Sequence, residues 1–141
     1  MIQRIQSVYL FLALLALGAL FSRLPLIVAV EPTDVSQINE TLLIIEQIFV
    51  GLSAFITFAA IFLYGNRKRQ MTAVKTAILF TVVGLITIAV DYFVANGKLG
   101  AANITVDPFA VIGTVALILQ LMGHKGITND ERIVRGADRL R

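Results

Sequence analysis

The stretch that decides the fold is LLIIEQIFVGLSAFITFAAIFLY, residues 42–64. It holds one charged residue, Glu46, among 23 positions. As a helix it would be about 34 Å long, enough to cross a hydrocarbon core of about 30 Å. Similar apolar runs cover residues 8–21, 76–95 and 109–122. A soluble domain of 141 residues could not bury four such segments in one core, so we expect four membrane-spanning helices.

The composition argues against several kinds of functional site. Hydrophobic residues make up 57% of the chain and charged residues 15%. The chain has no cysteine, which excludes a disulfide framework and a thiolate metal site, and its one histidine excludes a multi-histidine metal cage within one chain. No serine–histidine pair and no phosphate-binding glycine loop can be assembled. We therefore expect no enzyme, no catalytic residue, no metal and no cofactor.

The distribution of basic residues predicts the topology. If the N-terminus is cytoplasmic, ten of the twelve Lys and Arg residues lie in inner segments, and only Arg23 and Lys98 lie in outer ones. Short loops with this bias fix the orientation of a membrane protein, because translocation of Lys and Arg is disfavoured. We expect an all-α, four-transmembrane-helix bundle with both termini cytoplasmic.

The apolar runs and their flanks give expected boundaries. Spanning helices are expected near residues 5–24, 42–64, 73–95 and 108–123, forming one transmembrane domain over residues 1–127. The first run could instead be a signal peptide, but no small-x-small cleavage site follows Phe21, so we expect a retained helix. Asp107 and Pro108 open the fourth helix as a cap and first-turn proline. We place its end at Gly123, with Gln120 within reach of water and His124 as an interfacial anchor.

Two features of the connecting segments leave alternatives open. Residues 26–30 and 103–106 are short β-branched stretches in the two outer loops. They could pair into a small ribbon, or form irregular connectors on the membrane surface. In the inner turn, Arg67, Lys68 and Arg69 could bind anionic headgroups. We favour a purely topological role for these three residues, since both roles need only positive charge.

Asp91 is the one residue that invites a chemical hypothesis. A carboxylate inside the outer leaflet is costly and usually faces a partner or a wet cavity. Glu46 is expected at similar depth on the neighbouring helix, and two close carboxylates suit a proton-coupled transporter. The simpler interpretation is that helix three enters the membrane near Ala73, which leaves Asp91 solvated and idle at the outer interface. We favour this interpretation.

The C-terminal segment, residues 128–141, is predicted to form a separate cytoplasmic amphipathic helix. Thr128 and Glu131 form a capping box. An apolar face beside a basic stripe is typical of an element that lies on a membrane or docks on a partner. Nucleic acid is not expected, because no aromatic residue offers a stacking platform. The candidate docking residues are Arg132, Ile133, Arg135, Arg139 and Leu140.

Both ends of the chain resemble a known family. MIQRIQSVYL at residues 1–10, the Asn66-Arg67-Lys68 turn and DERIVRGADRLR at residues 130–141 are similar to bacterial four-helix inner-membrane proteins of the domain of unknown function 4293 family. Gly136 departs from the serine expected there. The resemblance implies a bacterial inner-membrane location and four helices, and it implies no activity, ligand or site residue.

We therefore expect a non-catalytic, multi-pass protein of the bacterial inner membrane. Its expected role is an accessory or assembly subunit of a membrane complex, docking through the cytoplasmic tail. Its partners would be the lipid bilayer, other membrane subunits and, as an option, anionic lipid headgroups. The alternative is a small oligomeric proton-coupled transporter that uses Asp91 and Glu46.

Overall fold

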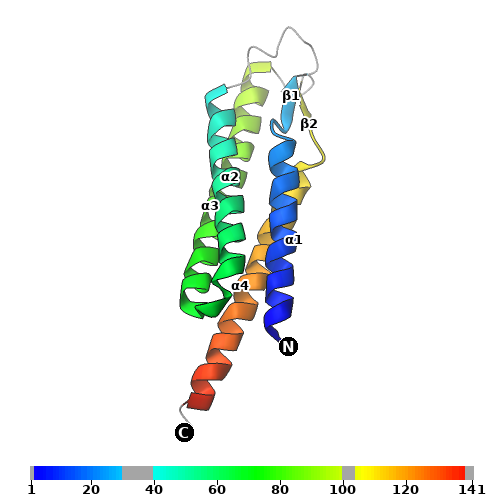
Figure 1. Ribbon diagram of the computed structural model, residues 1–141. Coiled ribbons are helices and arrows are strands. Elements are labelled where there is room, and N and C mark those ends of the chain that lie inside the picture. The colour runs from blue at the N-terminus through cyan, green and yellow to red at the C-terminus, as the bar shows by residue number, and fades with distance from the viewer. Residues whose placement is uncertain (1, 30–39, 100–103, 139–141) are drawn as a thin grey trace.

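The computed structural model describes residues 2–29, 40–99 and 104–138, which form a four-helix bundle (Figure 1). The helices are α1 (Ile2–Ser22), α2 (Glu40–Phe62), α3 (Arg67–Leu99) and α4 (Ala110–Asp138). Each contains a segment long and apolar enough to cross a membrane. α1 packs mainly against α4, and α2 against α3. The predicted all-α bundle with four helices of spanning length is confirmed, and it indicates a multi-pass membrane protein.

The two ends of the bundle differ. One end carries a short ribbon of strands β1 (Ile27–Ala29) and β2 (Ile104–Val106), and we call it the ribbon end. The other carries the 3-10 turn η2 (Leu63–Gly65) between α2 and α3, and we call it the turn end. Figure 1 shows both ends of the chain near the turn end, where α4 extends past the other three helices.

Buried residues recur in every helix at alternating intervals of three and four. This spacing averages 3.5 residues and places one seam of each helix toward its neighbours, as in left-handed bundles. Large apolar side chains cover the outside instead: Phe55 is 69% exposed and Phe93 is 70% exposed, as suits surfaces that face lipid. The buried seams consist of Gln6, Leu10, Ala13, Leu17 and Leu20 in α1; Glu46, Val50, Ser53, Thr57 and Ala60 in α2; Gln70, Val74, Ala77, Thr81, Gly84, Ile88, Asp91 and Ala95 in α3; and Gly113, Ala116, Gln120, Gly123, Ile127 and Asp130 in α4.

Glycines let α1 approach α4 closely. A Cβ atom added to Gly123 would lie 2.9 Å from Cδ2 of Leu10, and one added to Gly126 would lie 2.7 Å from Cγ of Gln6. Neither position accepts a side chain unless its neighbour moves. Small residues at such crossings are the usual means of tight helix packing in membranes, where dispersion contacts hold helices together.

The ribbon at the ribbon end is one of the two arrangements left open by the sequence, and the structure confirms it. β1 and β2 are antiparallel, with Ile27 opposite Val106. The backbone N–H of Asp107 donates to the carbonyl of Leu26 at 2.7 Å and extends the pairing. Asp107 Oδ1 then accepts the N–H of Phe109 at 2.9 Å, which is the predicted capping bond of α4.

The predicted end of the fourth helix at Gly123 is wrong. α4 continues without interruption to Asp138, so no separate tail helix begins at Thr128 and the expected division after residue 127 is not seen. Thr128 caps nothing: its hydroxyl donates to the carbonyl of His124 at 2.9 Å, inside the helix. The physical reason is packing, because Gly123 lies in the seam against α1 rather than at a helix terminus.

Candidate functional site

Polar side chains occupy the buried seams at three levels of the bundle. Glu46 and Asp91 lie toward the ribbon end, and Gln6 and Asp130 lie toward the turn end. Between these two levels lies a group of four side chains, which we call the central cluster. Buried polar groups in a spanning bundle are costly unless they find partners, so each level needs its own account. The central cluster consists of Ser53, Thr57, Thr81 and Gln120.

Glu46 and Asp91 form a pair of buried carboxylates between α2 and α3. Glu46 is 1% exposed and Asp91 is 2% exposed. The favoured expectation that Asp91 is solvated at the interface is therefore wrong, because Asp91 continues the seam positions Gly84 and Ile88 and turns into the bundle. Asp91 lies close enough to Glu46 to act on it electrostatically.

Glu46 is also incompletely satisfied. Its Oε1 atom is buried and has no hydrogen-bond partner within the described part of the chain. Lys98, in the last turn of α3, acts electrostatically on Asp91. A buried carboxylate oxygen without a donor is a place where a proton or a cation would be stabilised.

Gln120 joins three helices at the central cluster. Its Nε2 donates to Thr57 Oγ1 at 2.9 Å and lies 3.1 Å from Ser53 Oγ, and its Oε1 accepts from Thr81 Oγ1 at 2.8 Å. The expectation that Gln120 reaches water is wrong, because the residue is 0% exposed. The amide uses its donor and acceptor sides on different helices, which fixes the register of α4 against α2 and α3.

Small residues on α3 let α2 approach α3 closely at the level of the central cluster. The hydroxyl of Ser53 donates to the carbonyl of Ala77 at 3.0 Å and lies 2.5 Å from Thr81 Oγ1. Ala73, Ala77 and Thr81 recur at a spacing of four in the sequence, and these contacts show that Ala77 and Thr81 lie against α2. The hydroxyl network itself was not predicted, although the 3-4 spacing of Ser53, Thr57 and Ala60 signals a shared face.

The turn end contains one more buried polar contact. Gln6 Nε2 donates to Asp130 Oδ2 at 2.6 Å and ties the start of α1 to α4. His124 is half-buried, and its Nε2 has no hydrogen-bond partner among the described residues; Lys75 lies within electrostatic range of it. The contact between Gln6 and Asp130 was missed in the sequence, because Asp130 was assigned to a separate tail.

The predicted basic docking residues fall into two places. Arg67, Lys68 and Arg69 form the first turn of α3, where Asn66 Oδ1 accepts the N–H of Arg69 at 3.2 Å and caps the helix. Arg132 and Ile133 are exposed on the last turns of α4, and Arg135 belongs to the same helix. Arg139 and Leu140 lie outside the described residues. The structure therefore separates these basic residues from the buried carboxylates by most of the length of the bundle.

The buried carboxylate pair offers a place where a proton or a cation could bind. Among the described residues, no group of three His, Asp or Glu side chains is placed to hold a metal ion. Within the described part of the chain, the buried or half-buried groups that can exchange protons include the Glu46–Asp91 pair in the interior and His124 near the turn end.

Comparison with known proteins adds the family. Neither the curated proteins nor the solved structures contain a match. One family model matches residues 2–140, which is nearly the whole chain and includes every described element. The chain therefore belongs to the family described as domain of unknown function (DUF4293).

Proposed function

We propose that this chain is a non-catalytic subunit of the bacterial inner membrane that serves a membrane complex as an accessory or assembly component and docks through the end of α4. The observation that carries the proposal is exposed apolar surface on the projecting part of that helix. Ile133 is 55% exposed and Val134 is 41% exposed. Figure 1 shows this segment beyond the ends of the other helices.

The position of these side chains supports docking on a partner. The last buried seam residue of α4 is Asp130, so no helix of the described chain covers the turns that follow. Thr128 contacts Met71 with its hydroxyl 3.5 Å from Sδ, which places Ile133 near the level of the basic turn at Arg67. Apolar side chains at that level gain free energy by contact with another protein, about 1.5–3 kcal/mol for a fully buried isoleucine.

The test is co-purification of the full-length protein in mild detergent. The double variant Ile133→Ser/Val134→Ser should lose a partner that the natural chain retains, while its amount in the membrane stays unchanged. The matched control Ile133→Leu/Val134→Leu keeps the apolar surface and should retain the partner. Truncation before Thr128 is a poorer test, because it also removes Asp130 and its bond to Gln6. An identical set of partners for the serine and leucine variants would refute docking at this surface.

A second candidate function is a small oligomeric proton-coupled transporter. The specific observation in its favour is the buried Glu46–Asp91 pair, in which Oε1 of Glu46 has no hydrogen-bond partner in the part of the chain that the structure describes. A carboxylate pair of this kind can take up and release one proton as its surroundings change. The protein would be reconstituted into liposomes that contain a pH-sensitive dye and placed under a proton gradient. Proton flux that disappears in Asp91→Asn would favour transport, and equal flux in natural and variant chains would exclude a role for this pair.

A further inference from the structure

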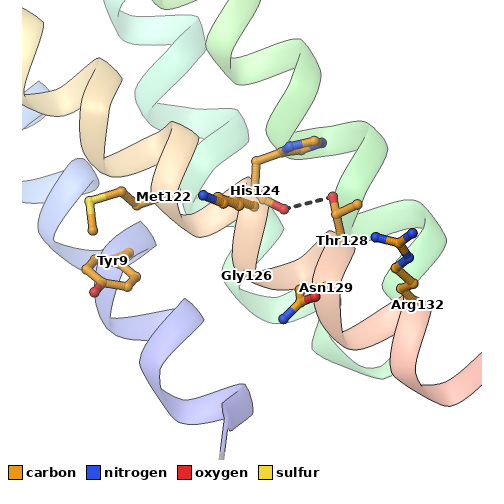
Figure 2. Close-up of a pocket in the computed structure, with 8 residues that line it drawn as sticks. Tyr9, Met122, His124, Gly126, Thr128, Asn129 and Arg132 are labelled. Carbon is orange, nitrogen blue, oxygen red and sulfur yellow. Dashed lines mark hydrogen bonds between the residues drawn. The ribbon is translucent and has the colours of Figure 1, made fainter.

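A hollow of about 680 Å³ lies on the outer face of α4 near the turn end, beside α1. Tyr9 contributes from α1 and the remaining lining comes from α4, as Figure 2 shows. The α4 residues that the argument uses are Met122, Lys125, Asn129 and Arg132.

These four α4 residues follow one another at intervals of three, four and three. They therefore form a single stripe along the helix. The buried seam of α4, at Gly123, Ile127 and Asp130, lies on the opposite side. Lys125 and Arg132 are exposed, and no element of the described chain covers them. The stripe is a surface that a ligand from the bilayer can reach sideways.

The polarity of the hollow changes along the axis of α4. Met122 and Tyr9 form its apolar end, nearer the middle of the bundle, and Figure 2 shows Met122 extending from α4 above Tyr9. Arg132 forms the opposite end, ten residues and about 15 Å further along α4. This length exceeds the headgroup layer, which is about 5–8 Å on each side of a bilayer. A stripe of this length is long enough to span the headgroup layer and to contact the first acyl carbons below it.

The charge in the hollow has one sign. Lys125 and Arg132 are its charged residues, and no acidic side chain is among its lining residues in the described chain. The nearest seam acid, Asp130, accepts a hydrogen bond from Gln6 in the interior. Between the two cations lies the amide of Asn129, which can donate to an anion.

We propose that this hollow binds one anionic glycerophospholipid from the leaflet at the turn end. Lys125 and Arg132 bind the phosphate and the charged headgroup, Asn129 donates between them, and the first acyl carbons pack on Tyr9 and Met122. A free phosphate would use the two cations alone and would leave the apolar end of the hollow empty. The site is independent of the proposed partner surface, because Ile133 and Val134 do not line the hollow.

The experiment compares lipid retention by full-length variants. Protein purified from nanodiscs of phosphatidylcholine with one fifth phosphatidylglycerol is examined by native mass spectrometry at low and at moderate salt. Lys125→Gln/Arg132→Gln should reduce bound phosphatidylglycerol at least about tenfold, because each basic side chain near an anionic lipid surface contributes on the order of one tenfold step or slightly less. The matched control Lys68→Gln/Arg69→Gln removes the same charge at the same end of the bundle and should retain the lipid.

Two further comparisons test whether the bound phosphate belongs to a lipid or is free, and whether surface charge alone explains binding. Tyr9→Ser/Met122→Ser should weaken phosphatidylglycerol retention and leave binding of inorganic phosphate unchanged. Equal lipid loss in the Lys68 and Lys125 double variants would overturn the proposal in favour of general surface charge. Full lipid retention by Lys125→Gln/Arg132→Gln would also overturn it. So would complete displacement of the lipid by millimolar inorganic phosphate. All altered residues lie on the surface or at its edge, and an unchanged thermal unfolding transition confirms that the variants fold.

Discussion

The two ends of this bundle handle charge in opposite ways. At the ribbon end, Glu46 and Asp91 turn inward and are almost fully buried. At the turn end, Lys68, Arg69 and Arg132 turn outward and are exposed. A base at the surface needs only water or a headgroup, whereas a carboxylate inside the bundle needs a proton, a cation or a donor. Among the described residues, the carboxylate oxygen left without a hydrogen-bond donor lies at the ribbon end, whereas the exposed bases of the turn end need no partner within the chain.

The central cluster separates these two ends. Apolar layers lie on both sides of it: Leu17, Val50 and Ile88 toward the ribbon end, and Leu10 and Val74 toward the turn end. The polar groups of the interior are thus arranged in layers that are not continuous with one another. Any proton that reaches Glu46 would have its shorter route from the ribbon end.

The largest expected effect is all-or-none and concerns topology: the turn end should lie on the cytoplasmic side of the membrane and the ribbon end on the external side. Reporter fusions after Asn66 and Arg141 should read cytoplasmic, and fusions after Asp34 and Gly100 should read external. The reason is that ten of the twelve basic residues flank the cytoplasmic sides of the spans under this orientation. An external signal at Arg141 would show that the count of spanning helices, or the assignment of the basic end to the cytoplasm, is wrong.

The next effect concerns the helix crossing at the turn end. Gly126→Leu should destabilise the bundle by about 1–3 kcal/mol or more, because its Cβ would lie 2.7 Å from Gln6 and force α1 away from α4. Gly18→Leu is the matched control, since a Cβ there meets nothing within 4 Å. Thermal unfolding in detergent measures the difference. Equal stability of the two variants would mean that α1 and α4 do not approach each other as described.

The contrast between these glycines also shows which part of the fold could not be predicted from the sequence. Length and hydropathy predicted four spans, and the β-branched stretches around Ile27 and Thr105 offered the ribbon as one alternative. The same reasoning ended α4 at Gly123, because a glycine after an apolar run is typical of a helix terminus. Whether a glycine ends a helix or admits a neighbour depends on what packs beside it, and that information lies in α1.

The burial of Asp91 was missed for a related reason. The position of Asp91 along the helix could be estimated from the rise per residue. Whether its side chain points into the bundle or toward solvent could not be deduced from that position alone. The direction follows from the 3-4 sequence of seam positions that joins Thr81, Gly84, Ile88 and Asp91. Gln120 was misplaced in the same way, because its inward direction appears only when the seams of three helices are known together.

A smaller effect is expected at the ribbon end. Glu46→Gln should leave the free energy of unfolding unchanged or raise it by up to about 1 kcal/mol, because it removes one of two like charges held in a low-dielectric interior. The amide also supplies a donor that can face Asp91. Glu40→Gln is the matched control at an exposed position of the same helix, where the lost charge favoured the helix N-terminus and stability should fall slightly. A large loss on Glu46→Gln would instead indicate that the glutamate charge itself is held by a bound cation.

The smallest effect is expected in the central cluster, which lies between the two ends. Thr57→Val should lower stability by about 0.6 kcal/mol, the average for a hydrogen bond between membrane helices, and by no more than about 1.7 kcal/mol. The reason is that Thr57 Oγ1 accepts Gln120 Nε2 at 2.9 Å, and the amide keeps its contact with Ser53 when that bond is lost. Thr114→Val is the matched control, because the Thr114 hydroxyl is exposed and donates only along its own helix, to the Val111 carbonyl at 2.7 Å. The control should lower stability by less than Thr57→Val. Both variants make the same change in volume and remove the same hydroxyl, so the difference between them measures the interhelical bond. If the two threonines cost the same, the bond between Thr57 and Gln120 would contribute nothing measurable to the stability of the bundle, and the contacts of Gln120 with Ser53 and Thr81 would be enough to hold α4 against α2 and α3.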